Sequence, residues 1–142
     1  PQAIPLIHQT WAYETNSTHD GFSRYSGSQS VMYTRLKAAY AEASKRTGFA
    51  LIPCGNVIQE LRRYPDFDIL RGGRSLCRDG YHLDFLYGRY AAAAVWYETI
   101  LNSDIRKNAY LPPAKEAISQ EKISLIKKVV HEICSQYSLK NC

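Results

Sequence analysis

Two short, wholly apolar stretches limit the fold of this 142-residue chain more than any other feature. Residues 4–7 (Ile-Pro-Leu-Ile) and residues 49–52 (Phe-Ala-Leu-Ile) lack the alternation of apolar and polar side chains that a half-exposed strand shows. We interpret both as buried strands. Between them, apolar side chains at helical spacing predict a helix over residues 28–47. Strands that alternate with helices indicate an α/β fold with a parallel sheet.

Helical patterns and irregular segments account for the rest of the chain. Ser28 or Ser30 is expected to cap the first helix, and Gly48 to end it. Further helices are predicted over residues 56–63, residues 84–101 and from Ser119 onward. Asp84 is expected to cap the second of these, and its apolar run over residues 91–96 favours burial against a sheet. Residues 11–29 and 66–83 are irregular, and loops of such length tend to be functional.

Two strands are too few for a complete parallel sheet. A two-stranded sheet leaves bare edges and cannot bury both faces of two apolar strands. We therefore predict that an N-terminal half of the same domain, or a second chain, supplies further strands. Residues 1–3 do not resemble a signal peptide, and no apolar stretch approaches the about 20 residues of a membrane-spanning helix. The chain is thus expected to be a piece of a larger protein, with no membrane span.

Charge and cysteine content exclude several functions. The 18 Lys and Arg exceed the 13 Asp and Glu, but the five Arg over residues 62–78 are diluted by acidic residues, so no nucleic-acid partner is expected. The four cysteines, Cys54, Cys77, Cys134 and Cys142, form no C-x-x-C motif and have no His at zinc-ligand spacing. We expect no metal site, and the disulfide state stays open.

The strongest candidates for catalytic residues are Asp79 and His82. Their D-x-x-H spacing can bring the carboxylate to Nδ1 of the imidazole, which fixes the tautomer and leaves Nε2 free as a general base. Gly80 allows the tight turn that this contact needs. The segment comes just before a buried helix, at the carboxyl end of a parallel sheet, where ligands bind. The alternative is a capping Asp beside a surface His, which is the commoner origin of such a spacing.

Several motifs together resemble a known family. Residues 78–83 (Arg-Asp-Gly-Tyr-His-Leu), 88–90 (Gly-Arg-Tyr) and 96–98 (Trp-Tyr-Glu) look like the final motif block of the SGNH, or GDSL-type, hydrolase superfamily. Residues 8–13 (His-Gln-Thr-Trp-Ala-Tyr) and 52–55 (Ile-Pro-Cys-Gly), the latter followed by Ile58-Gln59, are similar to a bacterial branch of it that is known only as a domain of unknown function. The resemblance spans roughly residues 4 to 102.

This resemblance implies a flavodoxin-like, three-layer fold and the hydrolysis of acyl esters, often on carbohydrates or lipids, without a cofactor. Residues 1–111 would form the C-terminal half of the hydrolase domain, and residues 112–142 a C-terminal helix packed on it. Asp79 would orient His82, the catalytic base. The serine nucleophile and oxyanion-hole residues of the superfamily have no counterpart here, so the chain alone is expected to be inactive. Relatives active on carbohydrates favour a periplasmic or extracellular location.

Other residues have two interpretations each. Trp11 and Tyr13 are candidates for walls of a substrate pocket, where aromatic faces suit sugar rings, or they pack the long loop. Tyr81 is a third candidate for the pocket wall, although a role as core anchor is favoured.

For most of the remaining polar and aromatic candidates a structural interpretation is preferred. Arg71, Arg74 and Arg78 are expected to be solvated rather than bound to an anionic substrate. His8 is interpreted as buried and hydrogen-bonded, His19 and His131 as exposed, and Trp96 and Tyr97 as core.

Two functions of different classes are compatible with these residues. One is the C-terminal half of a serine esterase. The other is a non-catalytic carbohydrate-binding or interaction domain on the same scaffold.

Overall fold

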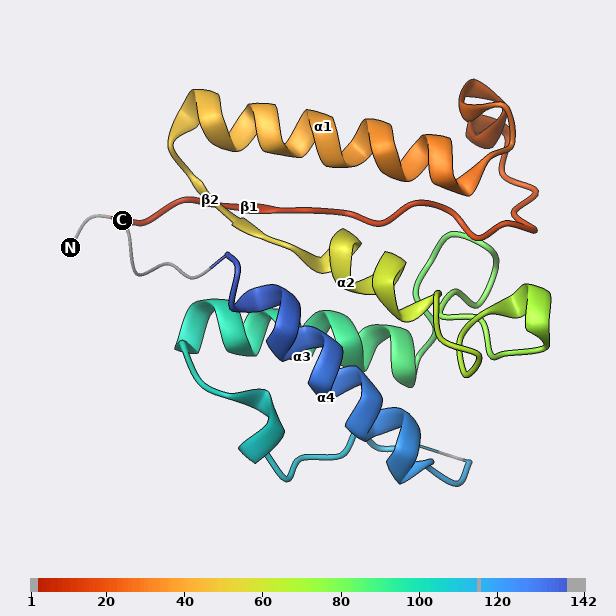
Figure 1. Cartoon of the computed structure of the whole chain (residues 1–142), viewed down its shortest axis with the longest axis vertical. Helices are drawn as coiled ribbons and strands as arrows, with labels where there is room; N and C mark the ends of the chain where they lie inside the picture. Colours follow the sequence, from red (N-terminus) through yellow and green to blue (C-terminus); the bar gives the residue numbers. More distant parts are fainter. Residues whose placement is uncertain (1–2, 115, 138–142) are drawn as a thin grey trace.

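The computed structural model describes residues 3–114 and 116–137. Its sheet has two parallel strands, β1 (Leu6–His8) and β2 (Ala50–Ile52). Helix α1 (Gln29–Thr47) lies on one side of the strands, and α2 (Cys54–Leu61), α3 (Tyr87–Leu101) and α4 (Gln120–Cys134) lie on the other (Figure 1). The predicted α/β class and the parallel sheet are confirmed. The complete flavodoxin-like fold is not, because the described residues form only these two strands.

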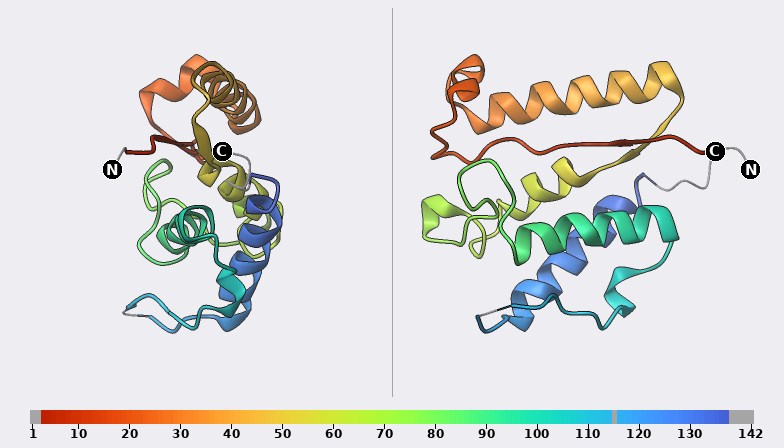
Figure 2. Two further views of the ribbon diagram at one scale, coloured as in Figure 1. Left: turned by 90° about the vertical axis from the view of Figure 1, so that its left-hand side faces the viewer. Right: turned by 180° about the vertical axis from the view of Figure 1, so that it is seen from behind.

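Most of the core lies below the sheet, among α2, α3 and α4. Val57, Ile58 and Leu61 of α2 are fully buried. Opposite them stand Val95 of α3 and Ile126 of α4, which are also fully buried. A second, smaller cluster under α1 contains Ala12, Phe22 and Met32. In the side views of Figure 2 the strands run between α1 and the helices α3 and α4, and α1 contacts α2.

Helix α1 agrees with its local sequence signals at both ends. The Ser28 hydroxyl caps the helix by accepting a hydrogen bond from the N–H of Val31. The helix ends where expected, at Gly48, whose N–H donates to the carbonyl of Ser44.

Helix α3 differs from the prediction at its start and in its burial. Asp84 does not cap it directly: its carboxylate accepts hydrogen bonds from the N–H groups of Leu86 and Gly88, so the helix begins at Tyr87. One face of the apolar run is buried, chiefly against α2 and α4. The prediction that Trp96 belongs to the core is wrong, since 43% of its surface is exposed. The run has no polar side, so periodicity alone could not show which face is covered.

Smaller departures concern α2 and the first long loop. Helix α2 begins at Cys54, two residues before the predicted start, and ends at Leu61. The segment over residues 11–29 contains a 3₁₀ helix, Asp20–Tyr25, whose buried Phe22 anchors it. Two further 3₁₀ helices, Ile69–Arg71 and Ile105–Lys107, lie in later loops.

Strand β1 has one open edge within the described residues. Leu6 is paired with Ala50 and His8 with Ile52, and all three β1 residues are only half-buried. The N–H of Gln9 donates to the carbonyl of Ile52. Because donors alternate from side to side along a strand, the N–H of His8 points away from β2. The indole of Trp96 covers part of this region through a 3.0 Å hydrogen bond from Nε1 to Nδ1 of His8.

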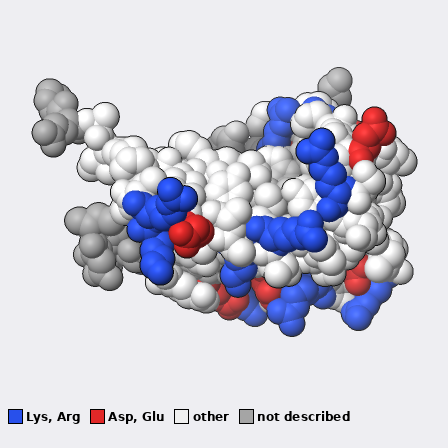
Figure 3. Space-filling view, turned by 90° about the horizontal axis from the view of Figure 1, so that it is seen from above, with Lys and Arg blue, Asp and Glu red and all other residues white. Residues whose placement is uncertain are grey.

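The surface carries dispersed charge. On the α1 face, a broad uncharged area separates the groups of Lys and Arg, and acidic side chains stand among some of them (Figure 3). Across residues 3–114 and 116–137, no helix combines the length and the apolar character needed to cross a membrane.

Candidate active site

Asp79 and His82 form a hydrogen-bonded pair on the loop before α3. Oδ2 of Asp79 lies 2.8 Å from Nδ1 of His82, the contact that the D-x-x-H spacing predicts. The other carboxylate oxygen accepts the N–H groups of Tyr81 and His82, at 3.2 and 2.7 Å. Gly80 has a φ of 84° and thereby makes the turn. The carboxylate is therefore held at both oxygens, and the imidazole is held at Nδ1.

The Asp79 carboxyl group is kept ionised by these contacts. Partial desolvation raises its pKa, but the hydrogen bonds from the His82 ring and from the backbone N–H groups of His82 and Tyr81 lower the pKa to about 2. The His82 side chain is 54% exposed, and within residues 3–114 and 116–137 nothing is hydrogen-bonded to its Nε2. That nitrogen can thus accept a proton from a group brought to it.

The chain that follows β1 meets this loop. Nε1 of Trp11 donates to the carbonyl of Tyr81 at 2.7 Å, and the N–H of Glu14 donates to the carbonyl of Gly80 at 2.7 Å. In Figure 1 the end of the β1 segment accordingly runs beside the loop before α3. The two predicted site segments, residues 8–13 and 78–83, therefore come together beyond the carboxyl ends of the strands.

An aromatic cluster adjoins the imidazole. The ring of Tyr81 lies 4.3 Å from that of His82, centroid to centroid, and 5.7 Å from that of Tyr13. His19 stands between Tyr13 and Tyr81, at 4.9 and 4.8 Å. Its Nδ1 accepts the N–H of Gly21, so Nε2 carries the proton when the ring is neutral. His19 is exposed, as predicted, but its place beside the candidate pocket wall was missed because the loop shows no periodic pattern.

A buried ion pair supports the same loop. Nε of Arg62 lies 3.1 Å from Oε1 of Glu14, and both side chains are at least 96% buried. The Glu14 carboxylate also accepts Nε2 of Gln29 and the hydroxyl of Ser75. Nη1 of Arg62 donates to the carbonyl of Ala12. This network joins α1 and α2 to the segment after β1, and sequence analysis did not find it.

The side chain of Asn56 is hydrogen-bonded to other parts of the fold. It exchanges two hydrogen bonds of 3.0 Å with Gln9, and its side chain also contacts the hydroxyls of Tyr33 and Tyr137. The side-chain oxygen of Asn56 thus accepts from Gln9 and Tyr33, and its Nδ2 donates to the hydroxyl of Tyr137.

Two arginines of the loop are paired with acids. Arg71 pairs with Asp68, and Arg74 bridges Asp84 and Glu116. The hydrogen bond from Arg74 lowers the pKa of Glu116. Arg78 differs: its guanidinium stacks on Phe85, and its Nε is 3.7 Å from Oδ2 of Asp79.

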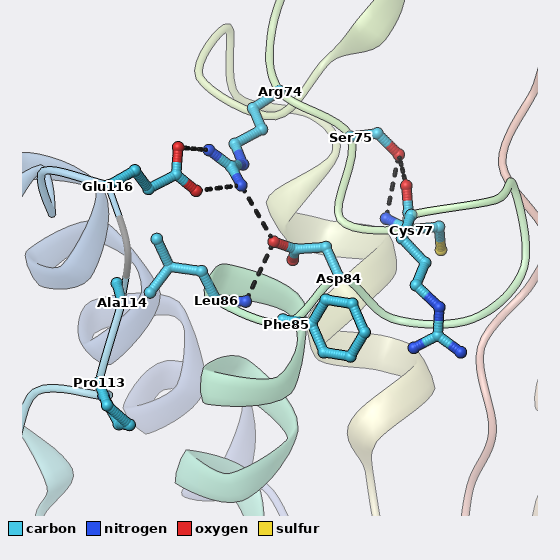
Figure 4. A pocket seen from close by; sticks show the side chains of 10 residues that line it. Arg74, Ser75, Cys77, Asp84, Phe85, Leu86, Pro113, Ala114 and Glu116 are labelled. Atoms are coloured by element: carbon cyan, nitrogen blue, oxygen red, sulfur yellow. Dashed lines mark hydrogen bonds and ion pairs between the residues drawn. The ribbon is translucent and has the colours of Figure 1, made fainter.

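A cavity of about 720 Å³ opens between Arg74 and Arg78 on one side and the segment before α4 on the other. Figure 4 shows Glu116, Arg74 and Asp84 linked by hydrogen bonds on one side, with Phe85 and Pro113 below them. Leu86, Ala114 and Cys77 complete most of the lining.

The prediction that His131 is an uninformative exposed residue is wrong. It is half-buried between α3 and α4, with Nδ1 3.1 Å from Oε1 of Glu98 and 3.6 Å from Oδ1 of Asp104. Among residues 3–114 and 116–137, these three form a group that could hold a metal ion, each offering one ligand atom. They are, however, engaged in hydrogen bonds, since Glu98 accepts the N–H of Ile105 and Asp104 accepts the guanidinium of Arg106.

The cysteines are poor nucleophiles. Cys54, Cys77 and Cys134 are free and buried, and burial raises the pKa of their thiols to about 12, 11 and 12. Cys142 lies outside the described residues. No serine hydroxyl among the described residues is hydrogen-bonded to His82.

Comparison with known protein families shows to which family this chain belongs. Residues 1–133 match the model of DUF4886, a domain of unknown function. The chain belongs to the DUF4886 family. A crystal structure of a DUF4886 family protein from Bacteroides uniformis ATCC 8492 is similar, with 34% sequence identity and a TM-score of 0.81. No curated protein matches the sequence.

The DUF4886 chain spans about half the length of that relative. The superposition covers 94% of this chain and 48% of the other. The predicted branch, a bacterial domain of unknown function, is therefore confirmed at the level of the DUF4886 family. The link to hydrolases remains a proposal.

Proposed function

We propose that this DUF4886 chain contributes the acid–base pair of a serine ester hydrolase of the SGNH type. The observation that carries the proposal is the Asp79–His82 contact of 2.8 Å, with the imidazole oriented through Nδ1 and half of its side chain exposed. A free Nε2 on an oriented imidazole is what general-base activation of a hydroxyl requires. The ring of Tyr81 lies beside the imidazole, and Trp11 and Tyr13 both contact Tyr81. Such aromatic side chains suit a small-molecule or carbohydrate ester substrate.

The serine and the oxyanion hole would come from polypeptide beyond these residues, either an N-terminal half of the domain or a second chain. Two features support this requirement: the open edge of β1, and a relative about twice as long. A parallel strand added beside β1 would end next to the segment that carries Trp11. Its C-terminal loop would then lie at the same end of the sheet as His82.

The reaction would follow the familiar two-step course. Nε2 of His82 takes the proton of the serine hydroxyl while the oxygen attacks the ester carbonyl. The imidazolium, stabilised by Asp79, then protonates the leaving alcohol, and an acyl-enzyme remains. Water, deprotonated by His82, attacks the acyl-enzyme and releases the acid and the free serine. Asp79 stays ionised throughout, consistent with its low pKa.

Esterase assays on the longest polypeptide that the gene encodes test this proposal. With p-nitrophenyl acetate, His82→Ala and Asp79→Asn should each lower kcat by at least about 10³-fold. A fluorophosphonate probe should label one serine. The matched control is His131→Gln, which alters a second His–carboxylate contact away from the site and should leave kcat within about twofold.

The second candidate is a non-catalytic carbohydrate-binding domain, which the aromatic cluster of Tyr13, His19 and Tyr81 favours. Absence of both turnover and serine labelling in the longest polypeptide, with sugar binding retained, would establish this alternative and reject the esterase.

A further inference from the structure

We propose that Arg78, Phe85 and Arg89 form a subsite for an anionic group, so that the ligand of this chain is an acidic carbohydrate or a similar ester with a carboxylate, phosphate or sulfate. This inference rests on the proposed function for the identity of the reacting ester, but binding of the anion does not depend on catalysis.

The first observation is a ring shared by two cations. Phe85 is 66% exposed and is therefore accessible to a ligand. The guanidinium carbon of Arg78 lies 4.9 Å from the centre of its ring, and that of Arg89 lies 4.5 Å from it. The ring therefore holds two positive charges close together through cation–π contacts. An anion that lies near both guanidinium groups is attracted by both charges.

The second observation is the state of the other arginines nearby. Arg62, Arg71 and Arg74 each have a carboxylate within 3.3 Å. Arg78 has only the longer 3.7 Å contact with Asp79, a carboxylate that already binds His82. For Arg89, no acidic side chain of the described residues lies within ion-pair distance. The guanidinium groups of Arg78 and Arg89 are thus less closely paired with carboxylates than those of Arg62, Arg71 and Arg74.

The third observation places this charge relative to the candidate base. Oδ2 of Asp79 contacts both Nδ1 of His82, at 2.8 Å, and Nε of Arg78, at 3.7 Å. The guanidinium is also fixed by its contact with the carbonyl of Leu83. An anionic group bound by Arg78 and an ester carbonyl placed at His82 would therefore be close enough to belong to the same sugar unit.

The fourth observation is the adjoining cavity. Arg78 and Phe85 line the space of about 720 Å³, a volume typical of small-molecule sites. Asp84, beside Phe85, and Glu116, farther away, are both paired with the guanidinium of Arg74, as Figure 4 shows. Arg74 offsets one of these two negative charges, and Arg78 and Arg89 supply the positive charge that an anion near Phe85 would meet. The apolar part of a ligand can fill the space beside Leu86 and Pro113.

Direct binding measurements on the 142-residue chain test the subsite. Backbone amide shifts in ¹⁵N–¹H spectra would be followed with D-glucuronate, glucose 6-phosphate, glucose 6-sulfate and D-glucose, at constant ionic strength. The acidic sugars should shift the amides of Phe85 and Arg89 and bind more tightly than glucose. The relative affinities of the three acidic sugars show which anionic group the site takes.

Substitutions at the two cations provide the decisive comparison. Arg78→Gln or Arg89→Gln should each weaken binding of the best acidic sugar by about tenfold, and the double variant should remove its advantage over glucose. Arg63→Gln is the matched control, because this exposed guanidinium pairs with Glu60 on α2 and should have no effect. Equal affinity for glucose and all acidic sugars, or full affinity in the double variant, would overturn the inference.

The same variants separate the two proposals. His82→Ala should leave anion binding intact while it abolishes turnover in the longest polypeptide. Anion binding that depends on Arg78 and Arg89, in a protein whose turnover ignores His82, would retain the subsite and reject the esterase. Loss of turnover in His82→Ala, without any preference for acidic sugars, would do the reverse.

Discussion

At the scale of single residues, the Asp79 carboxyl group gives the most direct prediction. Its pKa of about 2 in the folded chain lies below the ordinary value of 3.8, owing to three hydrogen-bond donors that outweigh partial desolvation. His82→Ala removes the ring donor and keeps both backbone N–H groups, so the pKa should rise part of the way back. Titration of the Asp79 carboxyl carbon by ¹³C NMR measures this. An unchanged pKa would show that the imidazole does not hold the carboxylate.

The sign of the pH dependence follows from the same shift. Because the folded-state pKa is lowered, the stabilisation from Asp79 is complete well above pH 3.8 and is lost as the pH falls through about 2. In Asp79→Asn, the free energy of unfolding should therefore fall less steeply with decreasing pH in this range. At neutral pH its dependence on pH should be the same as in the unmodified chain.

The buried pair of Arg62 and Glu14 gives a second prediction at this scale. Arg62→Met leaves a carboxylate inside the protein without its cation, so the free energy of unfolding should fall by about 3–5 kcal/mol. Adding Glu14→Gln removes that charge and should recover part of the loss. Urea denaturation of the two variants measures both effects. A double variant less stable than Arg62→Met would contradict this account.

Local sequence predicted one of these pairs and missed the other for a physical reason. Asp79 and His82 stand within one turn, so their spacing alone brings them together. Glu14 and Arg62 lie on different elements and meet only after β1, α2 and the intervening helix have packed. Nothing in a Ser- and Thr-rich loop marks Glu14 as a residue that will be buried.

At the scale of elements, α2 illustrates how closely the chain after β1 is packed. A Cβ on Gly55 would collide with the carbonyl oxygen of Thr10. Gly55→Ala should therefore lower the free energy of unfolding by about 3 kcal/mol. Gly72→Ala is the control: it has open space but a φ of 80°, so only backbone strain of about 1 kcal/mol applies. Equal losses in the two variants would rule out the proposed collision.

Element boundaries were predictable where the signal is local. Ser28 and Gly48 define α1 correctly, because a cap and a helix end act through adjacent backbone groups. The start of α3 was three residues off, since Asp84 satisfies the first N–H groups of the helix from outside it. The same limitation applies to Trp96, whose exposure depends on how α3 rotates against α2 and α4.

At the scale of the whole molecule, the open edge of β1 predicts a contrast in hydrogen exchange. The N–H of Gln9 donates to Ile52, whereas the N–H of His8 points to the open side. In the 142-residue chain the His8 amide should exchange much faster than that of Gln9. In the longest polypeptide of the gene, a further strand should protect His8 as well. Fast exchange at His8 in both would contradict completion of the sheet at this edge.

The arrangement around His8 also has an optical consequence. Trp11 and Trp96 are the two tryptophans of the chain, and their rings lie 6.3 and 5.6 Å from the His8 imidazole. Tryptophan emission thus arises at one place, and a protonated imidazole quenches indole fluorescence. Burial lowers the pKa of His8 from its ordinary value of 6.5, so protonation of this ring, and with it the loss of emission, should need a lower pH than for a free imidazole. The two tryptophans therefore act as an intrinsic fluorescent probe of the open edge of β1. Binding of another polypeptide at this edge should change the wavelength and the intensity of their emission.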